Sequence, residues 1–221
     1  MKGKSLWFGI CFIAVCAMAV GWSVSAQVQF PADGHSSSVH YRGVINDYPV
    51  SKDSTGATTG PWELRGPWSL EVHPHSGTAD FSAALTMEFS DLAAGAGATT
   101  DARKQHTHQI TMNGATAVQN PPQSDCPSGL TPFPTYTWQL EVTGVADVAG
   151  NGGFAFGQGI SVPLQVCIGG GPNVQASNVT LVFTNLANGE PSLATYHFGA
   201  QAIHGVVRAA KPDDDDSRGS H

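Results

Sequence analysis

The sequence predicts an all-β protein built as a single antiparallel β-barrel, with a β-sandwich as the alternative. Short runs rich in Val, Thr, Phe and Trp alternate apolar with polar residues, and Gly, Asn and Pro separate these runs. No stretch repeats apolar residues at spacings of three and four over a dozen residues, as an amphipathic helix would. Charged residues make up 12% of the chain and glycine occurs 26 times, a composition typical of many strands joined by turns.

The first 26 residues have the organisation of a secretory signal peptide. Lys2 and Lys4 precede an apolar run over about residues 6–20, and the small residues Val-Ser-Ala at 24–26 offer a cleavage site. The apolar run is shorter than the roughly 20 residues that span a bilayer. We therefore expect cleavage after residue 26, a mature form that does not span the membrane, and a periplasmic or extracellular location.

The remaining chain fits a single antiparallel β-domain over residues 27–210 and an acidic disordered tail over 211–221. About 195 residues are enough for one domain with its own core. The tail carries four consecutive Asp, and like charges in such a run repel one another and stay solvated. Without the signal peptide the chain holds 8 Lys and Arg against 17 Asp and Glu, a net charge of −9. An acidic chain without a basic cluster argues against nucleic acid as a partner.

The first predicted elements are an opening strand over residues 39–45 and a β-hairpin over 67–91. In the hairpin, apolar and polar residues alternate on both sides of a turn at 73–77, so one face of each strand is apolar. The residues expected on the apolar face are Trp68, Leu70, Val72, Phe81, Ala83, Leu85, Met87 and Phe89. The polar face carries Glu71, Asp80 and Glu88, for which solvation is a simpler role than a catalytic carboxylate pair.

Five further strands are predicted near residues 106–112, 136–145, 159–167, 178–184 and 203–209. Long Gly-, Ala- and Pro-rich breaks over 92–103 and 120–135 predict loops, and long loops on a rigid scaffold often border a site. The first and last strands, in YRGVIND and IHGVVRA, share a small apolar pattern around a glycine. Pairing of these two strands would close the sheet into a barrel without edges.

Two cysteines remain after removal of the signal peptide, Cys126 and Cys167. An even pair in an exported chain predicts one disulfide, and no C-x-x-C spacing favours a metal or redox site. The bond would pin the second long loop to a strand and stabilise the fold by about 4 kcal/mol in the chain-entropy model.

The segments GPWELRGPWSLEV, ADFSAALTMEFSD and HTHQI carry a resemblance. Together they resemble exported bacterial β-domain proteins of unassigned function that share a W-x-L…ADF-x-A-x-L-x-M core and an H-T-H strand. The similarity covers about residues 41–112 and the closing HFGAQAIHGVVR, and it implies no activity. At the level of fold alone, the size and strand content are similar to barrels of the allene oxide cyclase and dirigent type.

The segment QHTHQITM contains the strongest candidate site. Residues two apart in a strand point to the same side, so His106 and His108 share a face with Ile110 and Met112. The polar residues between them form the natural solvent face, which turns both histidines inward. A buried imidazole must find a partner or bear a desolvation cost of a few kcal/mol. We therefore predict that both rings line a cavity or the mouth of the barrel, where they bind a small ligand or a metal.

Two imidazoles at i and i+2 on a strand can share one metal ion, and copper or zinc is the expected metal. A third ligand would come from His197 in ATYHFGA or His204 in QAIHGVV. Seven residues separate these two, which places them on opposite faces of an unbroken strand unless Gly199 starts a turn. At most one is expected to join, and His197 is preferred.

Other patterns carry weaker signals. His73 and His75 form a second H-x-H, but it lies in the predicted hairpin turn, where solvation is expected. Trp68 and Trp138 alternate with core-type residues and are predicted to be buried, whereas Trp62, between Pro61 and Glu63, is the expected exposed aromatic. The motifs of serine hydrolases and of phosphate- or dinucleotide-binding folds are absent.

Three functions remain open from the sequence. The first is an exported β-barrel-type binding protein that holds a small ligand or transition metal at His106 and His108. The second is a small barrel enzyme, cyclase-like, isomerase-like or metal-dependent, that acts on a small apolar substrate. The third is a structural envelope or surface interaction domain without a small-molecule site, in which the histidines only support the fold.

Overall fold

The computed structural model describes residues 38–52, 58–59, 61–89, 105–121, 126, 137–151, 159–171, 174–199 and 201–212. The predicted signal peptide, the loop over 92–103, most of the loop over 120–135 and the tail beyond residue 212 lie outside the described residues. The expectations for these segments therefore stay predictions.

Eight antiparallel strands form a closed barrel in the order β1-β10-β9-β8-β7-β6-β5-β4. Neighbours in this order are neighbours in sequence except at the seam between β1 and β10, so the barrel is an up-and-down meander that closes on itself. The barrel strands are β1 (Val39–Asp47), β4 (Trp62–His73), β5 (Thr78–Phe89), β6 (His106–Gln119), β7 (Thr137–Gly150), β8 (Ile160–Gly171), β9 (Val174–Phe183) and β10 (Ile203–Pro212). The prediction of an antiparallel barrel is confirmed.

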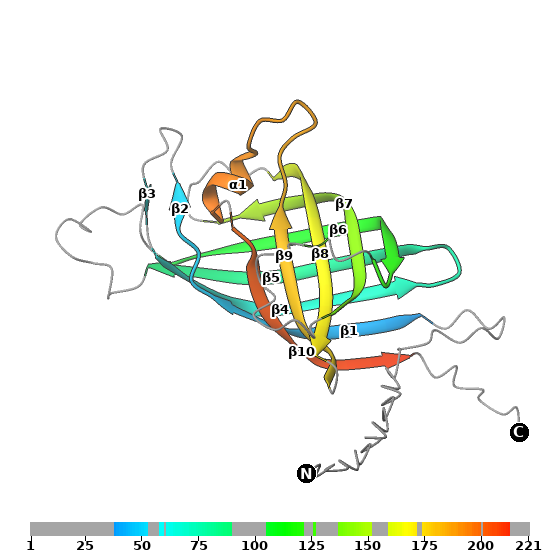
Figure 1. Ribbon diagram of the computed structural model, residues 1–221. Coiled ribbons are helices and arrows are strands. Elements are labelled where there is room, and N and C mark those ends of the chain that lie inside the picture. The colour runs from blue at the N-terminus through cyan, green and yellow to red at the C-terminus, as the bar shows by residue number, and fades with distance from the viewer. Residues whose placement is uncertain are drawn as a thin grey trace, which may run out of the picture.

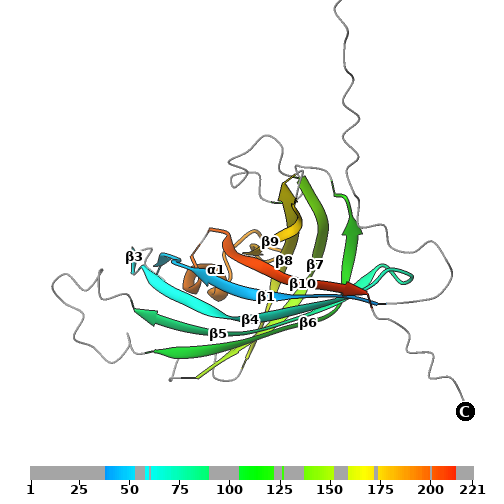
Figure 2. The same ribbon diagram turned by 90° about the horizontal axis from the view of Figure 1, so that it is seen from below.

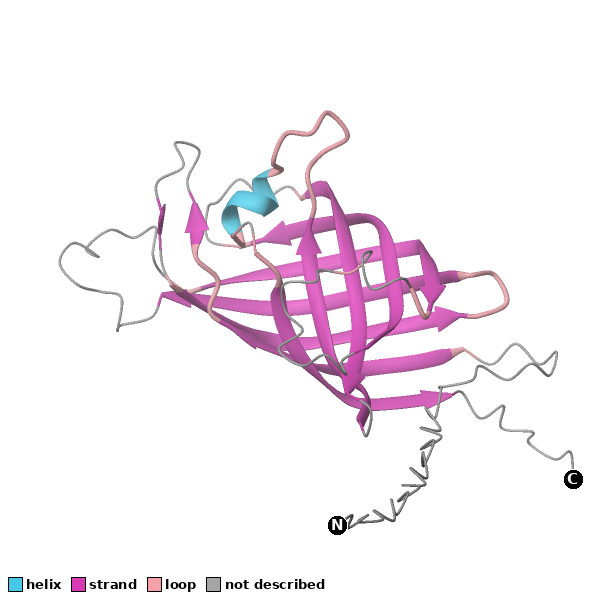
Figure 3. Cartoon of the chain, viewed as in Figure 1, coloured by secondary structure: helices cyan, strands magenta, loops and turns pink. Residues whose placement is uncertain are grey.

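The barrel has two halves whose strands cross. Figure 1 shows β7, β8 and β9 running steeply across β4, β5 and β6, and β10 joins the two halves. The short strands β2 (Ser51–Lys52) and β3 (Thr58–Thr59) pair outside the barrel, near the helix α1 (Leu193–His197). In the view from below, α1 lies on the concave side of the sheet that contains β1 and β4, toward one end of the molecule (Figure 2). Strands dominate the described residues (Figure 3).

The seam between β1 and β10 depends on a glycine. Gly43 pairs with Val207, and a Cβ on Gly43 would lie 1.9 Å from the carbonyl oxygen of Val206 and 2.8 Å from Nε1 of Trp68. No other residue fits at that distance, because any side chain would push the two strands apart. The glycine in YRGVIND therefore permits the predicted pairing of the first and last strands.

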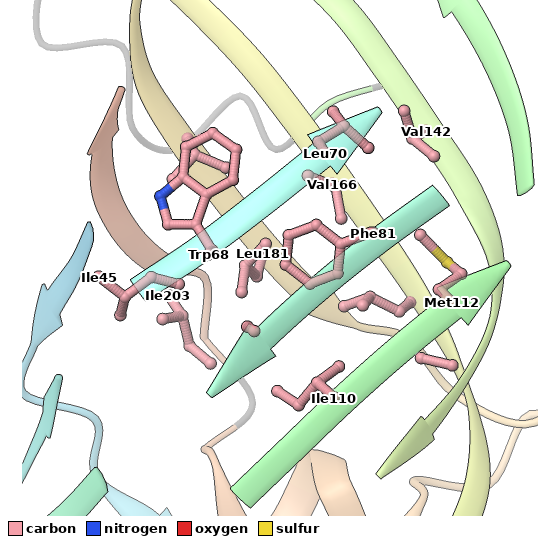
Figure 4. Close-up of a cluster of buried hydrophobic side chains, with 14 of the residues drawn as sticks. Ile45, Trp68, Leu70, Phe81, Ile110, Met112, Val142, Val166, Leu181 and Ile203 are labelled. Atoms are coloured by element: carbon pink, nitrogen blue, oxygen red, sulfur yellow. The ribbon is translucent and has the colours of Figure 1, made fainter. Parts of the chain in front are cut away.

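Buried apolar side chains fill the space between the two halves (Figure 4). An eight-stranded barrel is just wide enough for side chains to fill its interior. The predicted hairpin is β4 and β5, with the turn between His73 and Thr78. Seven of the apolar-face residues named above, from Trp68 to Met87, are at most 4% exposed; the side chain of Phe89 is outside the described set.

Several strands extend beyond their predicted ends, and β6 extends furthest. β6 continues through Asn113 and Gly114 to Gln119, although an Asn-Gly pair usually marks a hairpin turn. Gly114 has a φ of 62°, and the register between β6 and β7 shifts between Thr111 and Thr116. The glycine therefore forms a bulge inside a long strand and does not end it.

The predicted disulfide between Cys126 and Cys167 is present, with the two Cα atoms 6.1 Å apart. Both cysteines and Trp138 form a small buried cluster of their own, separate from the main core. Trp138 is buried as predicted, but it covers the disulfide. In the described part of the chain, no helix is long and apolar enough to cross a membrane.

Candidate metal centre

His106 and His108 lie at the start of β6 and point into the barrel, as parity predicts. They are 2% and 0% exposed, and their Cα partners on β5 are Met87 and Leu85. The backbone between them is held by Asn151, which follows β7. The Thr107 N–H donates to Asn151 Oδ1 at 2.8 Å, and the Asn151 N–H donates to the Thr107 carbonyl at 3.1 Å. These two hydrogen bonds fix the strand at the point from which both histidines project.

His197 reaches the same place from the helix α1. Ser192 caps the helix: its side-chain oxygen accepts from the Thr195 N–H at 3.0 Å. The Thr195 hydroxyl in turn donates to the carbonyl of Phe183, at the end of β9, at 3.4 Å. A five-residue helix has little stability of its own, so these buried contacts to the barrel hold it in place.

The helix ends immediately after His197. Phe198 is fully buried and stacks on Phe183, with ring centroids 4.8 Å apart. Gly199 follows with a φ of 81°, the left-handed conformation that glycine commonly supplies after a helix. A Cβ at Gly199 would also lie 2.7 Å from the Val50 carbonyl oxygen. The Ser192 cap before the helix and the turn after it orient His197 toward β6.

The three imidazoles converge on one point. His197 Nε2 lies 3.2 Å from His106 Nε2 and 2.9 Å from His108 Nε2. One ring nitrogen from each histidine lies within 4.8 Å of the other two, an arrangement close enough to hold a metal ion. The expected convergence of His197 with the strand pair is therefore observed. These three residues are called the histidine triad below.

His197 Nε2 lies close to two other imidazole nitrogens at once. A ring nitrogen of neutral imidazole carries either one hydrogen or one lone pair in the ring plane. His197 Nε2 nevertheless has two Nε2 neighbours at hydrogen-bonding distance. One hydrogen or one lone pair must serve both neighbours, which is poor geometry for at least one of them. A single cation among the three nitrogens would use all three lone pairs.

Burial keeps His108 and His197 neutral. Desolvation, followed by the neighbouring histidines, lowers the pKa of His108 from 6.5 to about 3. Desolvation and the charge of His106 likewise lower the pKa of His197 to about 3. An interaction with the backbone of Ala149 opposes the shift at His108. Neutral imidazole is the form that can ligate a metal.

Aromatic rings surround the triad. Phe198 lies edge-on to His108 at 4.9 Å and to His197 at 5.1 Å between ring centroids. Trp62 lies edge-on to His106 at 5.5 Å and is only 5% exposed. The prediction that Trp62 is an exposed aromatic is therefore wrong. Trp62 is the first residue of β4 and lies two residues before Leu64, which points inward. Residues two apart in a strand point to the same side, so the sequence pattern already indicated that Trp62 points inward.

The other sequence candidates lie elsewhere. His204, on β10, donates through its backbone N–H to Asp47 Oδ2 at 2.7 Å, and its Nδ1 lies 2.8 Å from the same oxygen. Burial alone would raise the pKa of Asp47, but the contacts with His204 and the hydrogen bond from the Tyr48 N–H together lower it. His73 lies at the hairpin turn, where its Nε2 is 3.3 Å from Asp80 Oδ2. Neither histidine joins the triad.

Comparison with known proteins gives no match: no protein-family model, no curated protein and no solved structure is similar to the chain. The function must therefore be inferred from the geometry of the site.

Proposed function

We propose that the protein is an exported metal-binding protein whose histidine triad holds one Zn(II) or Cu(II) ion. The observation that carries the proposal is the convergence of the three imidazole nitrogens of His106, His108 and His197. They come from two elements that are far apart in the sequence, β6 and α1. The predicted signal peptide and the disulfide between Cys126 and Cys167 support export.

The distances suit a tetrahedral ion. For zinc bound by histidine at about 2.0–2.1 Å, tetrahedral geometry places neighbouring nitrogens about 3.3 Å apart. The two nitrogen distances from His197, 3.2 Å and 2.9 Å, are close to this value. The nitrogens of His106 and His108 lie within 4.8 Å of each other, and rotation of these two rings would bring all three nitrogens to the distance that zinc requires.

The histidine triad lies among apolar rings, as the ligands of many protein metal sites do. The aromatic rings of Trp62 and Phe198 exclude water, which strengthens the attraction between the cation and its ligands.

The donor set narrows the choice of metal. Neutral imidazole suits zinc, copper and nickel, whereas calcium and magnesium prefer oxygen ligands. No carboxylate belongs to the triad, so the three neutral ligands leave the positive charge of the ion uncompensated. Three protein ligands leave a fourth coordination position for water or a small molecule.

That open position favours a second function, a small metal-dependent enzyme. Three protein ligands and an exchangeable fourth position are the arrangement of catalytic zinc sites, where the metal activates water or polarises a carbonyl. The apolar rings of Trp62 and Phe198 would suit a small apolar substrate. Turnover would have to disappear with the metal and return when it is restored.

Metal binding can be tested on the mature chain, purified without a histidine tag and treated with chelator. Isothermal titration with Zn(II) and Cu(II) should show one tight site per chain. His197→Gln should weaken binding by at least a hundredfold, because two imidazoles alone hold a metal poorly. X-ray absorption of the loaded protein should show three nitrogen ligands from histidine.

His75→Gln is the matched control, since His75 lies exposed in the hairpin turn and outside the triad. It should leave the tight site unchanged. Absence of stoichiometric uptake, or equal uptake by wild type and His197→Gln with both proteins folded, would refute the proposal.

A further inference from the structure

A depression of about 470 Å³ lies on the outer face of the barrel, away from the triad. It crosses β10, β1, β4, β5 and β6, and its size falls in the range of small-molecule sites. Its floor consists of short side chains that point outward from neighbouring strands. Val44, Pro67 and Ala84 form an apolar part, and Ser69 and Ser82 form a polar part.

Long polar side chains border this floor. Gln109 lies on one side, and Arg42 and Arg208 lie on the other. Arg42 pairs with Ala209 while Gly43 pairs with Val207, so Arg208 is the extra residue of a β-bulge. A bulge of this kind redirects a side chain, and here it places Arg208 beside Arg42 on the outer face.

Two neighbouring arginines are unexpected on this protein. The sequence has 10 Lys and Arg against 17 Asp and Glu, yet none of the residues that line the depression is acidic. Among the described residues, neither Arg42 nor Arg208 makes an ion pair, and both are exposed. Arg65, by contrast, pairs with Glu63 at 3.2 Å and with Glu88 at 3.1 Å. Like charges on adjacent strands repel each other unless an anion lies between them.

We infer that this depression is a second binding site, for a small organic anion with an apolar body. The guanidinium groups of Arg42 and Arg208 bind the carboxylate or sulfonate group, since arginine matches the geometry of such anions. The apolar body covers Val44, Pro67 and Ala84. The hydroxyl groups of Ser69 and Ser82, 2.8 Å apart, are available to a polar substituent.

The inference can be tested with 8-anilinonaphthalene-1-sulfonate, an organic anion with an aromatic body. Its fluorescence should reveal saturable binding at one site per chain, with the same Kd in chelator-treated and zinc-treated protein. Arg42→Gln and Arg208→Gln should each weaken binding by about fivefold, the effect expected for an exposed ion pair. The double variant should weaken it by about 25-fold if the two contributions add.

Three further measurements test separately the two arginines, the apolar floor and the apolar body of the ligand. Arg65→Gln removes a paired arginine outside the depression and should leave the Kd unchanged. Ala84→Trp keeps both arginines but fills the floor, and should abolish binding. Inorganic sulfate should compete at least tenfold more weakly than the probe binds, because it lacks an apolar body.

Equal Kd values for the wild type and the double variant would overturn the inference, as would unchanged binding by Ala84→Trp. Sulfate that binds as tightly as the probe would show that the apolar floor is not recognised, and would overturn it too. Circular dichroism confirms that each variant is folded before its Kd is compared. None of these outcomes depends on metal at the triad.

Discussion

Acid should destabilise the metal-free protein through the histidine triad. The pKa values of His108 and His197 are about 3 in the folded chain and 6.5 in the unfolded reference. Because the folded values are lower, the unfolded chain binds more protons between about pH 3 and pH 6.5. Stability is therefore fully present above pH 6.5 and falls as the pH is lowered through that window.

The size of the effect follows from the shift. Between pH 7 and pH 5, an unfolded histidine of ordinary pKa gains most of a proton while the folded one gains almost none, which costs about 2 kcal/mol for each residue. His108 and His197 together should lower the free energy of unfolding by about 4 kcal/mol. Asp47 and Asp80, whose pKa values are lowered from 3.8, lose their stabilising effect only at still lower pH.

Urea unfolding of the chelator-treated protein, with the disulfide intact, measures this difference at pH 7 and pH 5. The variant His197→Gln removes one titrating group and one like charge near His108, so its loss should be about 2 kcal/mol or less. Histidines outside the triad contribute equally to both proteins and cancel in the comparison. The same pH dependence in wild type and His197→Gln would refute the assignment of low pKa values to the triad.

Three further predictions concern the parts that hold the site. Replacement of both Cys126 and Cys167 by alanine should lower the free energy of unfolding by about 4 kcal/mol, from the loop that the bond closes, measured by urea unfolding; a loss below 1 kcal/mol would contradict the chain-entropy estimate. Asn151→Ala removes the hydrogen bond to the Thr107 N–H and should weaken zinc binding about fivefold in calorimetric titration, whereas unchanged affinity would show that β6 is fixed without it. Gly43→Ala should lower the melting temperature sharply or prevent folding, because its Cβ would lie 1.9 Å from a carbonyl oxygen; a stability equal to that of the wild type would contradict the tight seam.

Alternation predicted most of the barrel because the two faces of its strands differ so clearly. The same parity turned His106 and His108 inward, and the structure confirms it. Alternation along β4 also favoured burial of Trp62, but its position between Pro61 and Glu63 suggested exposure, and that prediction is wrong. Trp62 continues the inward row of β4.

The third histidine was predicted without its structural setting. His197 and His204 were expected on opposite faces of an unbroken strand, with His197 preferred, whereas His197 lies on a five-residue helix. So short a helix has no periodic signal, and its position depends on buried contacts with the end of β9. The outer depression was beyond prediction, because the bulge at Arg208 is a property of the register between β1 and β10.

The effect of the triad on the stability of the metal-free fold distinguishes a functional from a purely structural role. The three imidazoles are held out of water in an aromatic environment, and removing a polar ring from water costs free energy that an apolar side chain of similar volume does not bear. Leucine has nearly the volume of histidine and no polar atoms. If the histidines serve the metal, His108→Leu should raise the melting temperature of the chelator-treated protein while metal binding is lost.

If the histidines only support the fold, His108→Leu should lower the melting temperature in the same measurement. Zinc provides the reciprocal test, since a ligand that binds only the folded state stabilises it. Saturating Zn(II) should raise the melting temperature of the wild type and leave that of His108→Leu unchanged. A variant that is less stable without metal and equally stabilised by zinc would contradict the functional assignment of the triad.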